Sequence, residues 1–233
     1  MSLSPFSLAA CGVGMSSLCE VFPGGPTLQE STLNALERLS KKASHAGFKL
    51  RVESGFRPFE RQLSIWNRKA RGELALFDPL GNKLNAPDLS PNERLWAILH
   101  WSALPGTSRH HWGSDLDICD ALACPAGYEV QLTAAEVAPG GIFGPLHEWL
   151  DRQISQGQAE EFYRPYRPGC GKIQPERWHL SHAPTAREFE KYFSKQTLRE
   201  ILVGAQIELL DPILKNLDYI LENYTLCYFQ SAT

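Results

Sequence analysis

Hydrophobic and polar positions alternate along the chain with two different periods, and these periods predict helices and strands in turn. Between Leu28 and Ala43 apolar residues recur at helical spacing. The pattern Thr27-Leu28-Gln29-Glu30 is that of a capping box, so we expect a helix to begin there. The following segment, 48–53, alternates apolar and charged residues, which is the period of a half-buried strand.

The same reasoning predicts further helices along the chain. Apolar residues at helical spacing indicate helices that begin at Pro58 and at Ser90. A helix is expected near 143–156, and a terminal helix is expected from Asp211 to Tyr224.

The segments between these helices are rich in turn-forming residues. A loop of Gly, Ser and His residues, 104–113, leads into a predicted strand at 115–118. The stretch 162–182 combines aromatic residues with Pro and Gly and suits short strands joined by turns. Because the helices and strands do not follow a regular βαβ order, we predict an α+β fold, with a small antiparallel sheet flanked by helices.

Composition narrows the class of protein. A chain of 233 residues suits one compact domain, or one domain with a decorated tail. Its formal net charge of -3 argues against a nucleic acid or an anionic membrane surface as the main partner, because both attract a basic excess. No window is long and apolar enough to predict a membrane span.

The N-terminal segment and the cysteines bear on the compartment. Met1–Val21 contains no Lys or Arg and no long apolar run, so we expect no secretory signal and a cytoplasmic protein. If a signal was removed before this numbering began, the protein is periplasmic or otherwise extracytoplasmic. The 6 cysteines form no C-x-x-C pair, and we interpret them as free thiols, although a local bridge between Cys119 and Cys124 stays possible.

Two short segments concentrate the residue types that hydrolytic chemistry needs. Ser108–Asp117 and Pro175–Leu180 together offer imidazoles, carboxylates and a spare glutamate. A catalytic zinc ion takes three protein ligands and keeps one position open. A carboxylate that is not a ligand can then remove a proton from water as the water attacks a carbonyl group.

Local spacing suggests the ligands without selecting them uniquely. His110 and Asp117 lie seven residues apart, and Gly113 lets the backbone bend so that both can reach one ion. Glu176 and His179 can reach the same site if their segment is a turn that enters a strand. Asp115 shares a strand face with Asp117, so the alternative ligands remain His111, Asp115 and His182.

Three motifs, taken in order, resemble a known family. Ser108-Arg109-His110, the later Asp117 and Glu176-Arg177-Trp178-His179 are preceded by Ser54-Gly55-Phe56-Arg57 with Gln62 shortly after. This arrangement, over about residues 50 to 182, resembles the D-alanyl-D-alanine metallopeptidases. These include the vancomycin-resistance D,D-carboxypeptidases and D,D-dipeptidases, within the lysostaphin/D-Ala-D-Ala peptidase/hedgehog group. The chain departs from the family at Phe56, where a tyrosine is common, so one substrate contact is in doubt.

The resemblance implies a role for each matching residue. One zinc ion would be bound by His110, Asp117 and His179. Glu176 would be the general base and later the general acid, and Arg57 would meet the substrate's carboxylate or the developing oxyanion. Ser108 and Gln62 would contact the substrate or support the site. Trp178 flanks the proposed ligands and is a further candidate for substrate binding.

The resemblance also implies a fold and an activity. We expect a single zinc peptidase domain over 1–233, with a catalytic core at about 27–183, a C-terminal helical extension at 184–233 and the zinc site in a cleft over the sheet. The expected reaction is removal of terminal D-Ala from peptidoglycan-type peptides by a D,D-carboxypeptidase. An L,D-carboxypeptidase, a D,D-dipeptidase and an L-alanyl-D-glutamate endopeptidase would use the same site.

A rival interpretation from another class is a non-catalytic zinc-containing module that binds a peptide or a glycan, as in the hedgehog branch. Glu176 discriminates between the two classes, because a binding module needs no base beside its metal. The presence of Glu176 together with Arg57 favours the enzyme.

Overall fold

The centre of the protein is a four-stranded antiparallel sheet. The computed structural model describes residues 3–15 and 17–230, so both ends of the predicted 1–233 domain lie outside the described residues. The strand order is β3 (Leu50–Ser54), β6 (Asp115–Asp120), β8 (His179–His182) and β7 (Phe162–Tyr163). Each neighbouring pair is antiparallel. The predicted α+β class with a small antiparallel sheet is therefore confirmed.

Two short hairpins accompany this sheet. One pairs β1 (Cys19–Glu20) with β2 (Thr27–Leu28), and the other pairs β4 (Leu76–Phe77) with β5 (Lys83–Leu84).

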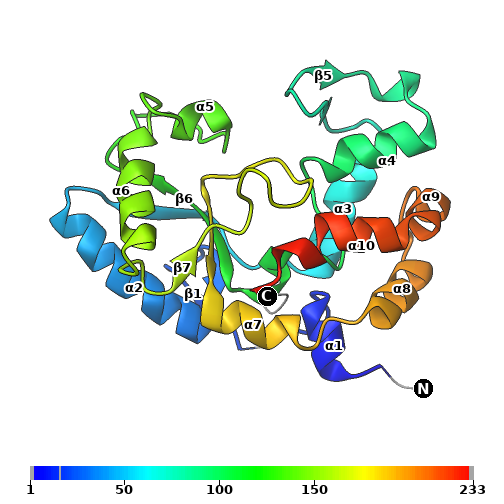
Figure 1. Ribbon diagram of the computed structural model, residues 1–233, viewed down its shortest axis with the longest axis horizontal. Coiled ribbons are helices and arrows are strands. Elements are labelled where there is room, and N and C mark those ends of the chain that lie inside the picture. The colour runs from blue at the N-terminus through cyan, green and yellow to red at the C-terminus, as the bar shows by residue number, and fades with distance from the viewer. Residues whose placement is uncertain (1–2, 16, 231–233) are drawn as a thin grey trace.

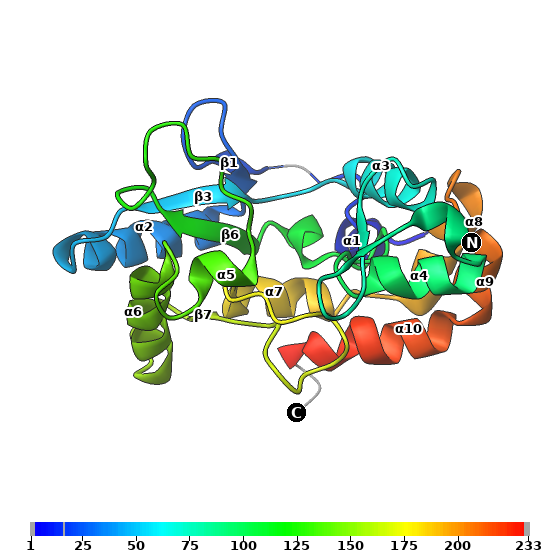
Figure 2. The same ribbon diagram turned by 90° about the horizontal axis from the view of Figure 1, so that it is seen from above.

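Helices gather in two groups around the sheet. On one side of the molecule lie α2 (Glu30–His45), α5 (Ala134–Val137) and α6 (Gly144–Ser155) (Figures 1 and 2). The other side is formed by α3 (Phe59–Ala70), α4 (Pro91–Leu99), α8 (Lys195–Gly204), α9 (Leu210–Lys215) and α10 (Leu217–Tyr224). The remaining helical segments are α1 (Pro5–Ala10), α7 (Ala183–Glu190), and the 3₁₀ turns η1 (Ala86–Asp88), η2 (Arg109–Trp112) and η3 (Leu226–Tyr228).

The first predicted helix begins later than its sequence pattern suggests. Thr27 and Leu28 form β2, and the Thr27 carbonyl accepts a hydrogen bond from the backbone N–H of Phe56 at 2.7 Å. The helix starts at Glu30 with no side-chain cap. The predicted capping box is therefore wrong, because strand pairing takes up the residue that would have capped the helix. The capping pattern at Ser90 does form, with Glu93 as its partner.

The predicted terminal helix is two helices. α9 and α10 meet at Asn216, whose backbone angles are not helical and whose side-chain amide donates to the Pro212 carbonyl at 2.8 Å. Sequence periodicity did not reveal this break, because both helices present apolar residues to the same core.

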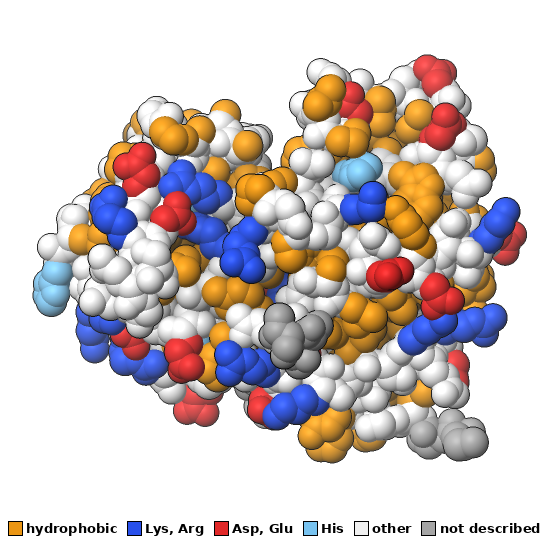
Figure 3. All heavy atoms as spheres, viewed as in Figure 1, with side chains coloured by type: hydrophobic (Ala, Val, Ile, Leu, Met, Phe, Trp, Pro, Cys, Tyr) orange, Lys and Arg blue, Asp and Glu red, His pale blue; other side chains and the backbone are white. Residues whose placement is uncertain are grey.

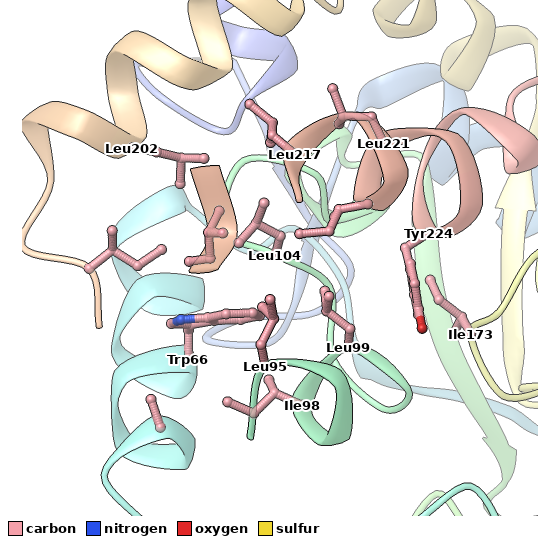
Figure 4. Close-up of a cluster of buried hydrophobic side chains, with 14 of the residues drawn as sticks. Trp66, Leu95, Ile98, Leu99, Leu104, Ile173, Leu202, Leu217, Leu221 and Tyr224 are labelled. Atoms are coloured by element: carbon pink, nitrogen blue, oxygen red, sulfur yellow. The ribbon is translucent and has the colours of Figure 1, made fainter. Parts of the chain in front are cut away.

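The hydrophobic core has two main parts. Between the sheet, α2 and α6 lies a cluster that includes Leu39, Leu116, Ile118, Leu150 and Leu180. A second cluster joins α3 and α4 to the C-terminal helices. Figure 4 shows its side chains converging from α3 (Trp66), α4 (Leu95, Ile98, Leu99), α8 (Leu202) and α10 (Leu217, Leu221, Tyr224).

The N-terminal helix α1 packs against α7 and η2, and the Ala10 carbonyl accepts a hydrogen bond from the Trp112 indole at 2.9 Å. Across residues 3–15 and 17–230, no helix combines the length and the apolar character that a membrane crossing requires.

Candidate active site

Three neighbouring elements bring His110, Asp117 and His179 together. The residues come from η2, β6 and β8, and one ligand atom of each lies within 4.8 Å of the others. His110 Nε2 is 3.3 Å from Asp117 Oδ2, and His179 Nδ1 is 3.1 Å from Asp117 Oδ1. Asp117 and His179 are directly opposite one another in the β6–β8 pairing, so the sheet register itself sets this contact.

Gly113 makes the bend between η2 and β6. Its φ is +64°, and a Cβ there would lie 3.1 Å from the backbone nitrogen of Gln29. Any other residue would be strained at this position. The bend carries the chain from His110 into the strand that holds Asp117, as the sequence predicted.

Hydrogen bonds orient both imidazoles. His110 Nδ1 donates to the Gly55 carbonyl at 2.9 Å, which leaves its Nε2 lone pair facing Asp117. His179 Nε2 donates to Asp115 Oδ1 at 2.8 Å, which leaves Nδ1 facing Asp117. Such partners hold a histidine in the tautomer that a metal ion needs.

The cluster favours a positive charge at its centre. Asp117 Oδ1 and His179 Nδ1 are both buried and have no hydrogen-bond partner. Burial alone would lower the pKa of His179, but Asp115 and Asp117 outweigh it and raise that pKa to about 9. A nitrogen lone pair facing a carboxylate repels it unless a cation lies between them. The residues therefore fit a divalent metal ion bound by two imidazoles and one carboxylate.

Glu176 lies in the turn that enters β8. The backbone N–H of His179 donates to the Glu176 carbonyl at 3.2 Å, and this turn brings both side chains to one site, as predicted. Glu176 Oε2 is 3.7 Å from His179 Nδ1. Burial, together with the negative charge of Asp117, raises the pKa of Glu176 to about 7.

Arg57 approaches the cluster from the segment after β3. Its backbone N–H donates to the His110 carbonyl at 3.0 Å. Its guanidinium donates to Gln62 Oε1 at 2.9 Å and to Ser54 Oγ at 3.2 Å. The side-chain amide of Gln62 donates in turn to the Ala103 carbonyl at 2.7 Å. Both ends of Gln62 are thus engaged within the protein.

A cavity of about 230 Å³ opens over these residues. One wall is formed by Trp101, Ser102 and Ala103, which come shortly after α4 in the sequence. Another wall is formed by Leu132, just before α5. In Figure 3 the surface is hollowed between these two parts of the molecule. The lining residues are Arg57, Trp101, Ser102, Ala103, Ser108, His110, Asp117, Leu132, Tyr166, Ile173, Glu176, Trp178 and His179.

Comparison with known families identifies the chain. The family model "VanY: D-alanyl-D-alanine carboxypeptidase" matches residues 25–185. The chain belongs to this family. The resemblance seen in the sequence is confirmed, and with it the expected enzyme class, a zinc peptidase of peptidoglycan-type peptides.

Among individual proteins, one relative matches about half of this chain. An uncharacterized protein of Haemophilus influenzae is 31% identical over 123 residues, which make up 52% of this chain and 92% of that protein.

Two solved structures share the fold at 19% identity. One is a mutant of the vancomycin resistance D,D-pentapeptidase VanY, from a VanB-type resistance cassette, in complex with Zn(II). It has a TM-score of 0.51 and covers 85% of this chain and 90% of its own. The other is VanYB in complex with D-alanine-D-alanine, with a TM-score of 0.50 over 79% of this chain and 88% of that one.

The structure separates the proposed ligands of this family member from the alternatives that sequence spacing left open. His111 is engaged on both nitrogens, by the Arg57 carbonyl at 2.6 Å and by the Gly106 N–H at 3.1 Å. His182 Nδ1 contacts the hydroxyl of Thr185 at 2.8 Å. Asp115 supports His179 from the side away from Asp117. Within the described residues, the only cluster of His, Cys, Asp and Glu able to hold a metal is His110, Asp117 and His179.

The sequence pattern did not single out Arg109, which supports the metal cluster by pairing with Asp115, the partner of His179. Arg109 is 2% exposed and pairs with Asp115 at 3.0 Å and with Glu190 at 3.2 Å. It also donates to the Tyr228 carbonyl at 3.2 Å and to Ser181 Oγ at 2.9 Å. Its position inside the Ser108–His110 motif was the only signal available, because its partners come from distant parts of the chain.

Tyr228 links the C-terminal turn η3 to the cavity wall. Its hydroxyl accepts a hydrogen bond from the Ile173 N–H at 2.8 Å, and its ring lies 5.0 Å from that of Tyr166.

The 6 cysteines are all free thiols and contribute nothing to the metal cluster.

Proposed function

We propose that this protein is a D,D-carboxypeptidase that removes the terminal D-Ala from peptidoglycan-type peptides, with one zinc ion held by His110, Asp117 and His179. The observation that carries the proposal is the presence in one cavity of this cluster, of a partly buried glutamate that is not part of it, and of a partly buried arginine. Family membership and the fold shared with peptidases support it.

Zinc is the metal that this donor set suits, since two imidazoles and a carboxylate leave one of four positions open. When bound, the ion would polarise the scissile carbonyl and make water more acidic. Asp115 and the Gly55 carbonyl would keep both imidazoles oriented toward it.

Glu176 would act as the base and then as the acid. Its carboxylate takes a proton from the attacking water and then delivers it to the nitrogen of the departing residue. A group that must accept and then donate a proton works best with a pKa near the working pH, and burial moves the pKa of Glu176 in that direction.

Arg57 would stabilise the negative charge that develops on the scissile oxygen or hold the substrate's carboxylate. Its planar guanidinium is fixed by Ser54 and Gln62, so it needs no reorganisation during the reaction. We assign Gln62 to positioning Arg57. Ser108 and Trp178, which line the cavity, would contact the substrate.

The same site would serve an L,D-carboxypeptidase, a D,D-dipeptidase or an L-alanyl-D-glutamate endopeptidase, because these enzymes differ in pocket shape and not in reaction. A non-catalytic binding module is disfavoured, since it gives no reason to bury Glu176 beside the metal cluster. We also propose that 27–183 is the catalytic core of a single domain and that 184–233 is its helical extension.

The test is to incubate the zinc-loaded protein with muropeptides of defined length and to analyse the products by mass spectrometry. Loss of a single D-Ala from pentapeptides, with tetrapeptides left intact, is the expected result. Cleavage of tetrapeptides, release of dipeptides or cleavage of an internal bond would each replace the proposal with the corresponding alternative. Binding of muropeptides without cleavage would favour the module.

A further inference from the structure

Helix α3 directs two polar side chains at the same segment of the cavity wall. Gln62 and Lys69 are seven residues apart, which is two helical turns, so they lie on one face of the helix. Gln62 donates to the Ala103 carbonyl at 2.7 Å, and Lys69 Nζ donates to Ser102 Oγ at 2.5 Å. Both Ser102 and Ala103 line the cavity.

The ammonium of Lys69 is half-buried and lacks a carboxylate partner. No aspartate or glutamate in the described part of the chain forms an ion pair with it, and the ammonium donates instead to the Ser102 hydroxyl. Burial lowers the pKa of Lys69 to about 8, while the negative charge of Glu176 opposes this effect and Arg57 adds to it. The charges of Lys69, Glu176 and Arg57 are thus close enough to influence one another.

Arg57 and Lys69 lie at different places relative to the cavity. Arg57 is held beside the metal cluster by its backbone bond to His110 and by Gln62. Lys69 is joined to the cavity through Ser102, in the segment that follows α4. Because the Ser102 oxygen accepts from the ammonium, its own proton is free to be donated to a group in the cavity. A hydroxyl polarised in this way, with a positive charge behind it, favours an anion.

We propose that Lys69 and Ser102 form a subsite for the C-terminal carboxylate of the residue that leaves, so that Arg57 is available to the scissile carbonyl oxygen. This inference rests on the proposed carboxypeptidase function and deepens it. Ser102 donates its hydroxyl proton to the carboxylate, and the Lys69 ammonium behind it balances the negative charge. An anion bound there would supply the partner that the half-buried ammonium lacks.

The test compares one peptide in two forms, with a free C-terminal carboxylate and with a C-terminal carboxamide. The wild-type enzyme should prefer the free acid. Lys69→Met should raise KM for the acid roughly ten- to a hundredfold, the loss expected for a hydrogen-bonded charge, with a small effect on kcat. KM for the carboxamide should stay constant, so the preference for the acid collapses. Lys69→Arg should restore part of that preference.

Arg68→Met is the matched control, because it removes a charge from the neighbouring, exposed position of the same helix. It should leave the acid-to-amide ratio unchanged. If Lys69→Met does not fold, as judged by its thermal transition, Ser102→Ala replaces it and should weaken the preference for the acid.

The outcomes separate the two hypotheses. A wild-type protein that cleaves neither peptide contradicts the proposed function itself. A wild-type protein that cleaves the acid, alongside folded Lys69→Met and Ser102→Ala variants with the wild-type KM and acid-to-amide ratio, overturns the subsite and leaves the carboxypeptidase in place.

Discussion

Asp115 holds His179 from behind, with its Oδ1 atom 2.8 Å from His179 Nε2, while Asp117 faces the Nδ1 atom of the same ring at 3.1 Å. The two aspartates alternate with Leu116 along β6 and therefore lie on one face of the strand. One imidazole is thus placed between two carboxylates, of which one orients it and the other shares its proposed metal ion.

Asp115→Asn should weaken zinc binding about 10- to 100-fold, which is the usual effect of losing a carboxylate that supports a metal-bound histidine. Asparagine keeps the shape but removes the negative charge that makes His179 a better ligand. Competition with a chelator of known affinity measures the change. Asp120→Asn, on the same strand, is the control, because among the described residues the Asp120 carboxylate accepts hydrogen bonds only from the backbone N–H groups of Lys49 and Leu122. Equal zinc affinity in the two variants would contradict the role of Asp115.

Glu176→Gln should keep stoichiometric zinc and lose about 10²- to 10⁴-fold in kcat, because the amide can neither accept nor deliver the proton. His179→Ala should lose the metal and the activity together. Zinc content by elemental analysis and initial rates on a pentapeptide are the two measurements. Near-wild-type turnover by Glu176→Gln would exclude it as the base.

Gln62→Met should reduce kcat/KM by roughly tenfold, because one ordinary hydrogen bond to Arg57 is lost while the side-chain volume is kept. The effect should appear mainly in kcat if Arg57 acts on the scissile oxygen, and mainly in KM if it holds the ground-state substrate. Glu60→Gln, exposed on the same helix, is the control for changes in α3. Unaltered kinetics in Gln62→Met would show that Ser54 alone is enough to position Arg57.

His147 should make the protein less stable in acid. Burial, reinforced by the charges of Arg164 and Arg177, lowers the pKa of His147 from 6.5 to about 3. Between these values the unfolded chain binds a proton that the folded protein does not. The free energy of unfolding should therefore fall as the pH falls, by up to about 1.4 kcal/mol per pH unit from this group.

Urea unfolding at several pH values between 6.5 and 4 measures the slope. His147→Leu should make that slope shallower, whatever it does to stability at neutral pH. His45→Leu, at the exposed end of α2, is the matched control variant. Identical slopes in the wild type and His147→Leu would count against this assignment.

Ile220→Ala should lower the free energy of unfolding by about 2–5 kcal/mol, because Ile220 is fully buried in the cluster that joins α10 to α3 and α4. Val203→Ala, at a position 51% exposed on α8, should cost much less. A single cooperative transition that shifts as a whole would support one domain. A separate early transition in Ile220→Ala would show that the C-terminal helices unfold independently of the catalytic core.

The metal cluster was predictable from sequence because its residues occur in local patterns. His110, Gly113 and Asp117 form one loop-and-strand unit, and Glu176 and His179 form one turn, so each half of the site is encoded within a few residues. The choice between Asp115 and Asp117 was not predictable from spacing, since it depends on which residue of β6 lies opposite His179 in the sheet.

Other features required long-range contacts that no local pattern carries. The capping-box pattern at Thr27 is overridden because β1 pairs with that residue. Arg109 and Lys69 resemble ordinary cations in the sequence, and only the folded chain places them against Glu190 and Ser102.

Support for the metal cluster extends well past the residues by which the family is defined. The family match ends at residue 185, yet Arg109, which holds Asp115, is bound by Glu190 and by the carbonyl of Tyr228. A truncated chain ending at the family boundary would retain every proposed ligand and lose both of these groups. Shortened or C-terminally fused versions of the protein should therefore be checked for zinc affinity before a loss of activity is attributed to the cavity.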